Sequence, residues 1–155
     1  MVDQHPDLIK WELDLRIVGL LRSAGYQVVY KQHPGGVLGK SPVGFFPDDV
    51  EVVREPFETV LDKADAFVLY HTVTTVLSSA LCTNKPIVFI HCGNERWLDE
   101  PYELFCKRVE VVPGRFDEAN RLMFDEERLL KALERKPSKP DESFVRTYYF
   151  PAGSS

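Results

Sequence analysis

Three of the four histidines come directly after apolar segments that are typical of β-strands. They are His33, His71 and His91. An imidazole can donate a hydrogen bond to a phosphate oxygen, and it can take up or release a proton near neutral pH. If the three preceding segments are parallel strands of one sheet, the rings share one edge and line a crevice for an anion. A histidine that is merely tolerated at the start of a loop explains each single position equally well.

Hydroxyl groups make the second candidate site. Thr72, Thr74 and Thr75 lie between a strand expected at 66–70 and a helix expected at 75–82. Hydroxyls at the start of a helix can cap its backbone N–H groups, and those N–H groups together with the helix dipole attract an anion. The pattern therefore predicts a phosphate site at this junction. An ordinary threonine cap is the alternative interpretation.

Two further segments could contribute to the same edge. Gly35 and Gly36, which follow His33, would let the backbone approach a ligand closely. Arg96 and Trp97 would offer a guanidinium and an indole to a phosphate, a sugar or a base. The alternatives are a tight turn in the first case and a surface ion pair beside a half-buried tryptophan in the second.

Familiar catalytic and cofactor motifs are absent from the sequence. The chain has no G-x-S-x-G elbow, no P-loop and no G-x-G-x-x-G fingerprint, which disfavours a serine hydrolase, a Walker ATPase and a dinucleotide enzyme. A metal would need ligands such as His71, His91 and Cys92 from separate loops, without the spacing of a known site. We therefore expect no metal and no cofactor, and the sequence names no catalytic residue.

The elements that must position these residues alternate along the chain. The expected helices cover 8–23, 56–63, 75–82, 98–105 and 125–133, and the expected strands cover 27–31, 50–53, 66–70, 85–90 and 108–112. In the first helix, apolar residues at spacings of three and four predict a buried face formed by Leu8, Trp11, Leu15, Val18 and Leu21. Pro113 and Gly114 are expected to end the last strand.

Strands that alternate with helices predict one α/β domain. We expect a Rossmann-like parallel sheet of about five strands with helices on both faces and a binding crevice at the carboxyl ends of the strands. This domain is expected to cover residues 1–136. Residues 137–155 are expected to form a linker and an aromatic tail that packs back on the domain or on a partner domain.

Composition limits the classes of partner. The 155 residues carry a net charge of −5, and the basic residues are scattered, so nucleic acid is not expected as a partner. Three cysteines without C-x-x-C spacing and a start unlike a signal peptide predict a cytoplasmic protein. The uncharged stretch 66–84 is interrupted by threonine, serine and histidine, so at most peripheral membrane association is expected.

Four short motifs resemble a known family in order and spacing. They are Lys31–Pro34, Ala64–Leu69, Thr74–Thr75, and Ser79–Leu81 with Asn84–Ile87. Together they resemble the C-terminal, donor-nucleotide-binding half of GT-B type glycosyltransferases of capsular and surface polysaccharide biosynthesis. The glycerophosphotransferases of teichoic acid synthesis are relatives of that family. The likeness extends from about Leu8 to the aromatic tail.

The resemblance implies a nucleotide-activated sugar or alcohol donor as ligand. By position, His33, Thr74 and Thr75 would contact its phosphates, with His71 as a possible further hydrogen-bond donor. Ser79 stands where many relatives have a glutamate that contacts the ribose. The resemblance therefore does not imply which nucleotide is bound or how tightly. The family's acceptor-binding domain has no counterpart here, so turnover would need an acceptor domain. A non-catalytic nucleotide-binding or protein-interaction module, an epimerase-like enzyme and a homo-oligomer contact remain alternatives.

Overall fold

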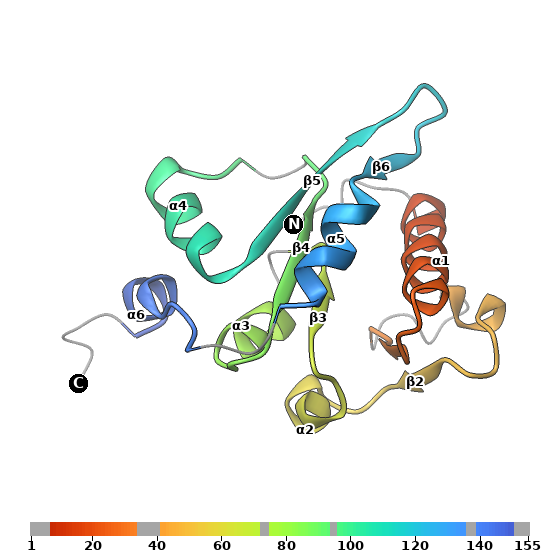
Figure 1. The fold of residues 1–155 in the computed structure, drawn as a ribbon, viewed down its shortest axis with the longest axis horizontal. Helices are drawn as coiled ribbons and strands as arrows, with labels where there is room; N and C mark the ends of the chain where they lie inside the picture. The colour runs from red at the N-terminus through yellow and green to blue at the C-terminus, as the bar shows by residue number, and fades with distance from the viewer. Residues whose placement is uncertain (1–6, 34–40, 72–74, 94–95, 136–138, 151–155) are drawn as a thin grey trace.

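The computed structural model describes residues 7–33, 41–71, 75–93, 96–135 and 139–150. Helices and strands alternate along most of the chain (Figure 1). In chain order they are α1 Asp7–Ser23, β1 Val29–Lys31, η2 Pro42–Phe45, β2 Glu51–Val53, α2 Phe57–Val60, η3 Leu61–Lys63, β3 Phe67–Leu69, α3 Thr75–Leu81, β4 Ile87–His91, α4 Asp99–Arg108, β5 Glu110–Phe116, β6 Leu122–Phe124, α5 Glu126–Leu133 and α6 Ser143–Tyr148.

The strands form two sheets. β1 and β2 form a parallel pair, and β3, β4, β5 and β6 form a four-stranded sheet in that order. Within the larger sheet β3, β4 and β5 are parallel, and β6 runs antiparallel to β5. The predicted α/β class with parallel strands is confirmed. The predicted single sheet of about five strands is wrong, because β1 does not pair with β3 and a strand after β5 was not expected.

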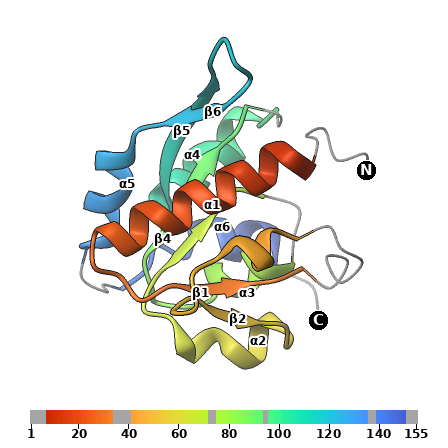
Figure 2. The same cartoon turned by 90° about the vertical axis from the view of Figure 1, so that its right-hand side faces the viewer.

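Two helical layers enclose the four-stranded sheet (Figure 2). Ile87 and Phe89 of β4 belong to an apolar cluster with residues of α2, α3, α4 and α6. Val88 and Ile90 belong to a second cluster with residues of α1 and α5. Successive side chains of a strand point to opposite faces, so β4 must be apolar throughout when helices cover both faces.

The sheet continues past the residues that were expected to end it. β5 runs through Pro113, which pairs with His91, and then turns back into β6. A Cβ atom on Gly114 would lie 3.0 Å from the carbonyl oxygen of His91 and 3.1 Å from Cδ1 of Leu122. Gly114 therefore permits a close approach of strands rather than a chain break. The β5–β6 hairpin projects from the sheet (Figure 1).

The buried face of α1 includes Val18, as predicted, but also Leu13 and Ile17, which the predicted spacing left out. Leu13, Ile17 and Val18 are between 2% and 7% exposed, whereas Leu8 is 73% exposed. Val18 packs against Val28, which precedes β1, whereas Leu13 and Ile17 belong to the cluster under the four-stranded sheet. α1 spans both sheets, so its contacts do not follow a single helical stripe.

A buried carboxylate on α1 connects the two sheets. Asp14 is 8% exposed. The hydroxyl of Tyr30 in β1 donates to its Oδ2 at 2.7 Å, and the hydroxyl of Tyr70, directly after β3, donates to its Oδ1 at 2.7 Å. Burial raises the pKa of Asp14 above its ordinary value of 3.8, although both hydrogen bonds and the charge of Lys10 oppose this increase.

The raised pKa predicts a pH dependence of stability. The folded chain holds this proton more tightly than the unfolded chain does, so the stability that Asp14 contributes is largest below pH 3.8 and is lost as the pH rises through the folded-state pKa. Asp14→Asn removes the titration. The free energy of unfolding of Asp14→Asn, relative to the unchanged chain, should therefore increase from pH 3.8 towards neutral pH in urea unfolding followed by circular dichroism.

Asp62→Asn is the matched control, because Asp62 is exposed in η3. The difference in free energy of unfolding between Asp62→Asn and the unchanged chain should vary much less between pH 3.8 and neutral pH. If the difference in free energy of unfolding between Asp14→Asn and the unchanged chain does not change with pH, the pKa of Asp14 is not raised in the folded chain.

Candidate functional site

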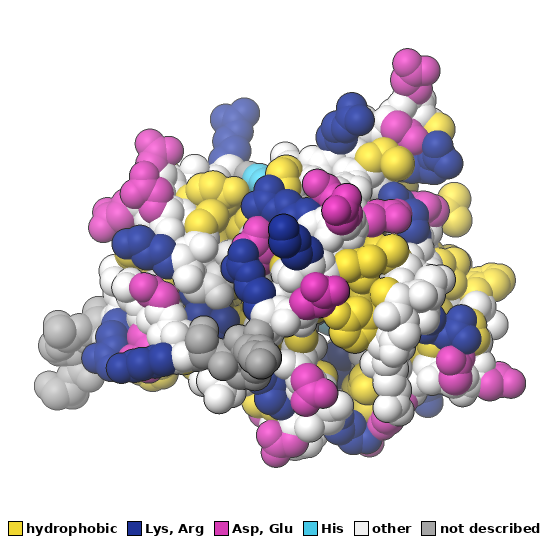
Figure 3. All heavy atoms as spheres, in the orientation of Figure 1, with side chains coloured by type: hydrophobic (Ala, Val, Ile, Leu, Met, Phe, Trp, Pro, Cys, Tyr) yellow, Lys and Arg dark blue, Asp and Glu magenta, His cyan; other side chains and the backbone are white. Residues whose placement is uncertain are grey.

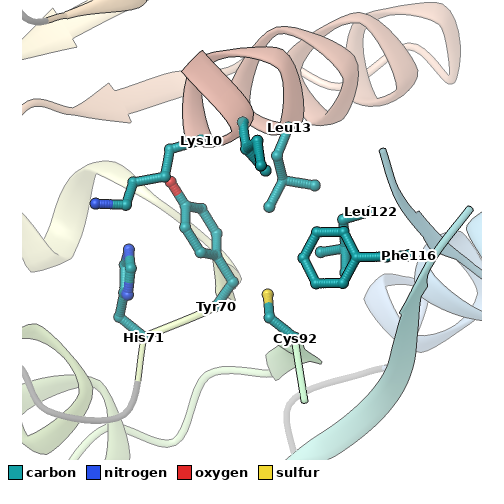
Figure 4. A pocket seen from close by; sticks show the side chains of 8 residues that line it. Lys10, Leu13, Tyr70, His71, Cys92, Phe116 and Leu122 are labelled. Atoms are coloured by element: carbon teal, nitrogen blue, oxygen red, sulfur yellow. The ribbon is translucent and has the colours of Figure 1, made fainter. Parts of the chain in front are cut away.

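A small pocket lies between the first turns of α1 and the carboxyl ends of β3 and β4 (Figure 4). Its lining residues are Ile9, Lys10, Leu13, Tyr70, His71, Cys92, Phe116 and Leu122. Most of the lining is apolar. The amino end of Lys10 and the ring of His71 extend to the same side of the Tyr70 ring (Figure 4). The pocket therefore combines an apolar wall with an ammonium and an imidazole, which can pair with an anion.

The fold explains why Lys10 and His71 lie on one side. Lys10 is one helical turn before Asp14 on α1, and His71 directly follows Tyr70. Asp14 accepts the hydroxyl hydrogen of Tyr70, so a single hydrogen bond joins the two segments that carry the candidate residues. The ring of His71 lies 4.5 Å from that of Tyr70. The Lys10 charge and the His71 ring are thus positioned by a buried contact beside them.

The three histidines do not line one shared crevice. His71 lies on the α1 side of the sheet. His91, the last residue of β4, lies with its ring 6.3 Å from Tyr102 of α4, in the helical layer on the other face. His33 follows β1 in the smaller sheet and is exposed. The prediction of one edge assumed one sheet, and the two sheets and the two faces separate the rings.

The hydroxyl residues are only partly covered by the structure. Thr75 is the first residue of α3 and is exposed, whereas Thr72 and Thr74 lie outside the described residues. Ser79 lies about one turn into α3 and donates from its hydroxyl to Oε1 of Glu58, at 3.1 Å. Glu58 is in the first turn of α2. Sequence reasoning did not find Glu58, because nothing in its local pattern connects it to Ser79.

A second group of polar residues surrounds the carboxyl ends of β1 and β2. Lys31 Nζ donates to the carbonyl oxygen of Gln32 at 2.7 Å, and Arg54 Nε donates to Oε1 of the same residue at 2.8 Å. The Gln32 side chain is 6% exposed, so it fixes Arg54 from a buried position. Two basic side chains thus lie next to the residue that precedes His33. Sequence reasoning missed Arg54. Its position directly after β2 is the same kind of signal that singled out His71 after β3.

The segment around Trp97 serves packing. The Trp97 ring stacks on Phe105 of α4 at 4.8 Å, and Phe105 lies 5.5 Å from Phe144 of α6. The aromatic tail is therefore held against α4 of the same chain. Trp97 Nε1 and His91 Nε2 are both buried without a hydrogen-bond partner. The structure favours the predicted alternative of a half-buried tryptophan, because one face of the indole packs on Phe105.

Lys85, from a motif that carried the family resemblance, has a structural contact. Its Nζ donates to the carbonyl oxygens of Leu61 and Ala64, each at 2.7 Å. Leu61 is the first residue of η3 and Ala64 directly follows its last residue, so Lys85 contacts both ends of this short helix. Arg108 supports the same region by donating to the carbonyl oxygens of Thr83 and Lys85 at 2.7 and 3.0 Å. The motif therefore stabilises the entry into β4.

Other kinds of site find no support in the described part of the chain. No group of three or more histidine, cysteine, aspartate or glutamate side chains there could hold a metal ion. None of the helices described has the length and apolar character needed to cross a membrane. On the face drawn in Figure 3, basic and acidic side chains are interspersed. Comparisons with protein-family models, with curated proteins and with solved structures gave no match to this chain.

The contact that positions His71 can be tested by removing one hydroxyl. Tyr70→Phe leaves the buried carboxylate of Asp14 without one of its two tyrosine donors. A hydrogen bond to a charged group contributes about 1.5–3 kcal/mol, so the free energy of unfolding should fall by about this amount. Tyr26→Phe is the control, because Tyr26 is 37% exposed. Equal effects of the two substitutions in urea unfolding would show that the Tyr70 hydroxyl does not stabilise the fold.

Proposed function

We propose that this chain binds a nucleotide-activated sugar or alcohol and acts as the donor-binding domain of a glycosyltransferase-like enzyme in surface polysaccharide synthesis. The observation that carries the proposal is that Lys10 and His71 line the same pocket at the carboxyl ends of β3 and β4. Ligands of open parallel sheets bind at this edge. An ammonium and an imidazole N–H are suitable partners for phosphate oxygens.

The smaller sheet offers a second set of phosphate partners. His33, Lys31 and Arg54 lie at the carboxyl ends of β1 and β2. Arg54 is held by Gln32, so its guanidinium is oriented before any ligand arrives. His33 and Thr75 are the contacts that the family resemblance implies. Because His33, Lys31 and Arg54 belong to a different sheet from His71, a donor that contacts both sets must extend from one sheet to the other.

The ribose contact is proposed to involve Glu58 together with Ser79. The hydrogen bond from Ser79 to Glu58 supports this proposal, because it puts a carboxylate next to the residue that stands in place of the family's glutamate. A carboxylate accepts hydrogen bonds from sugar hydroxyls, which a serine at this position could do only weakly. Glu58 is exposed, so its second oxygen has access to a ligand.

The proposed chemistry is stabilisation of a leaving group. Negative charge that grows on the departing nucleotide phosphate would be met by fixed cations at the sheet edge. No catalytic residue is assigned, because the acceptor must enter from a second domain. The chain alone is therefore proposed to bind the donor in the cytoplasm and to turn it over only with an acceptor domain.

A protein-interaction module is the second candidate. Large apolar side chains are exposed near α4 and α6: Leu98 is 77% exposed and Phe150 is 67% exposed. Tyr148 and Tyr149 beside them are about 40% exposed. Exposed apolar groups that gather on one side favour a protein partner. Binding of a protein partner is compatible with donor binding. If no nucleotide binds, it becomes the proposed function of the chain.

A nucleotide titration followed by NMR tests the proposal. CMP, CDP and UDP are added to the nitrogen-labelled chain, and the amides of His33, His71 and Thr75 are observed. Saturable shifts at these amides are expected. Lys10→Met removes one charge-assisted hydrogen bond, so the affinity for the diphosphates should fall about 10-fold or more.

Lys107→Met is the matched control, since Lys107 is an exposed residue near the end of α4. It should leave the affinity within about twofold of the unchanged chain. Absence of shifts with all three nucleotides would rule out donor binding. Equal losses in both variants would show that the binding is not at the pocket beside Lys10.

A further inference from the structure

The pocket beside α1 has two chemically different parts. Lys10 and His71 extend to one side of the Tyr70 ring (Figure 4). Cys92 and Leu122 lie on the other side of that ring (Figure 4). The first part attracts an anion, and the donor phosphate is proposed to bind there. The second part would then receive the chemical group that this phosphate carries.

The second part of the pocket is apolar and is built by three separate elements. Leu13 comes from α1, Cys92 follows β4, and Leu122 is the first residue of β6. These three side chains are between 1% and 7% exposed. Phe116, at the end of β5, adds an aromatic ring that is 39% exposed. The packing of the core therefore fixes most of this wall, and Phe116 extends it towards the surface.

The polar hydrogens in this wall are directed at other groups of the chain. The hydroxyl of Tyr70 donates its hydrogen to Asp14 at 2.7 Å, and the thiol of Cys92 donates to the carbonyl oxygen of Ile90 at 3.7 Å. Each of these side chains has a single hydrogen to donate. A ligand hydroxyl placed in the apolar part would therefore lose its hydrogen bonds to water and face mainly carbon atoms of the described lining, which is unfavourable.

The size of the pocket limits the group that can enter it. Its volume is about 10 Å³, which corresponds to about one water molecule. A water molecule is stable in a protein interior where it has about two to four polar partners. A methyl group is of similar size and needs no such partner. The apolar part of the pocket is therefore better suited to a methyl group than to water or a hydroxyl.

We infer that the group esterified to the phosphate at Lys10 and His71 ends in a methyl group, which occupies the apolar part of the pocket. The donor then carries a deoxy sugar or a deoxygenated alcohol, in which a methyl replaces the usual hydroxymethyl. This inference rests on the proposed function, because it identifies the group that the bound donor phosphate carries. The hydroxymethyl counterpart adds one oxygen atom to a site that is the size of a methyl group.

A matched pair of phosphate esters tests the inference. Butyl phosphate and the same ester with a terminal hydroxyl are titrated into the chain, which carries nitrogen-15 and carbon-13 methyl leucine labels. Butyl phosphate should bind at least about 10-fold more tightly, because apolar pockets disfavour an added hydroxyl by up to about 100-fold. Nuclear Overhauser contacts from its terminal methyl to Leu13 and Leu122 should place that methyl in the pocket.

A second pair distinguishes a sugar from an alcohol. The anomeric phosphates of L-fucose and L-galactose differ by the corresponding hydroxyl on the sugar. A similar preference for the fucose phosphate would assign a deoxy sugar to the pocket. A preference confined to the butyl pair would assign a deoxygenated alcohol.

A nearly isosteric variant tests the wall itself. Cys92→Ser puts a hydroxyl into the apolar part, so the affinity for butyl phosphate should fall at least about threefold and the preference over the hydroxylated ester should narrow. Cys82→Ser is the matched control, because Cys82 is exposed. It should leave both affinities unchanged. Equal losses in the two variants would contradict the assigned position of the methyl group.

The titrations of the unchanged chain remain decisive if Cys92→Ser is poorly folded. Equal affinities of the two butyl esters, or the lack of contacts to Leu13 and Leu122, would overturn the inference. Nucleotide shifts at His71 in the same preparation would then show that donor binding stands without it. If neither the esters nor the nucleotides shift His71, the inference and the proposed function both fail.

Discussion

The hydrogen bonds from Tyr30 and Tyr70 to the carboxylate of Asp14 hold the two halves of this fold in register. A buried carboxylate is unfavourable unless hydrogen-bonded donors replace the lost water. Here the two donors come from different sheets, so satisfying the carboxylate requires that α1, β1 and the end of β3 meet at one point. Apolar packing beneath α1 is not directional and could not impose this arrangement by itself.

The candidate site follows from that constraint. Lys10 is one turn from Asp14, and the positive charge of Lys10 opposes the rise of the Asp14 pKa that burial causes. The same ammonium extends towards the side of Tyr70 where His71 lies (Figure 4). The carboxylate therefore has two effects: it fixes the backbone around both candidate residues, and it partly balances the charge of one of them. An anion bound there would compete with Asp14 for the charge of Lys10. Asp14 therefore affects the anion affinity of the pocket without contacting the ligand.

Local patterns in the sequence predicted the elements but not their pairing. The apolar run 85–90 and the capped helix that begins at Asp125 have strong local signals, and both are present. Pro113 and Gly114 have the composition of a chain break, yet the close approach of His91 in β4, distant in sequence, makes that glycine part of a strand. The role of Asp14 depends on Tyr30 and Tyr70, which lie 16 and 56 residues away. No local pattern reports such contacts, so the separation of the sheets and the members of the pocket were not predictable.

The separation of the sheets bears directly on where a ligand can bind. Open α/β sheets bind ligands beside the point where strand order reverses, which is next to the first strand. In this chain Lys31 and Arg54 lie at the carboxyl ends of β1 and β2, whereas Lys10 and His71 lie beside the carboxyl ends of β3 and β4 in the other sheet. The two cationic groups are positioned by separate contacts: Gln32 holds Arg54 in the smaller sheet, and Tyr70 lies beside His71 after β3. A ligand that contacts both groups must therefore reach from one sheet to the other, and the cost of ordering it reduces its affinity.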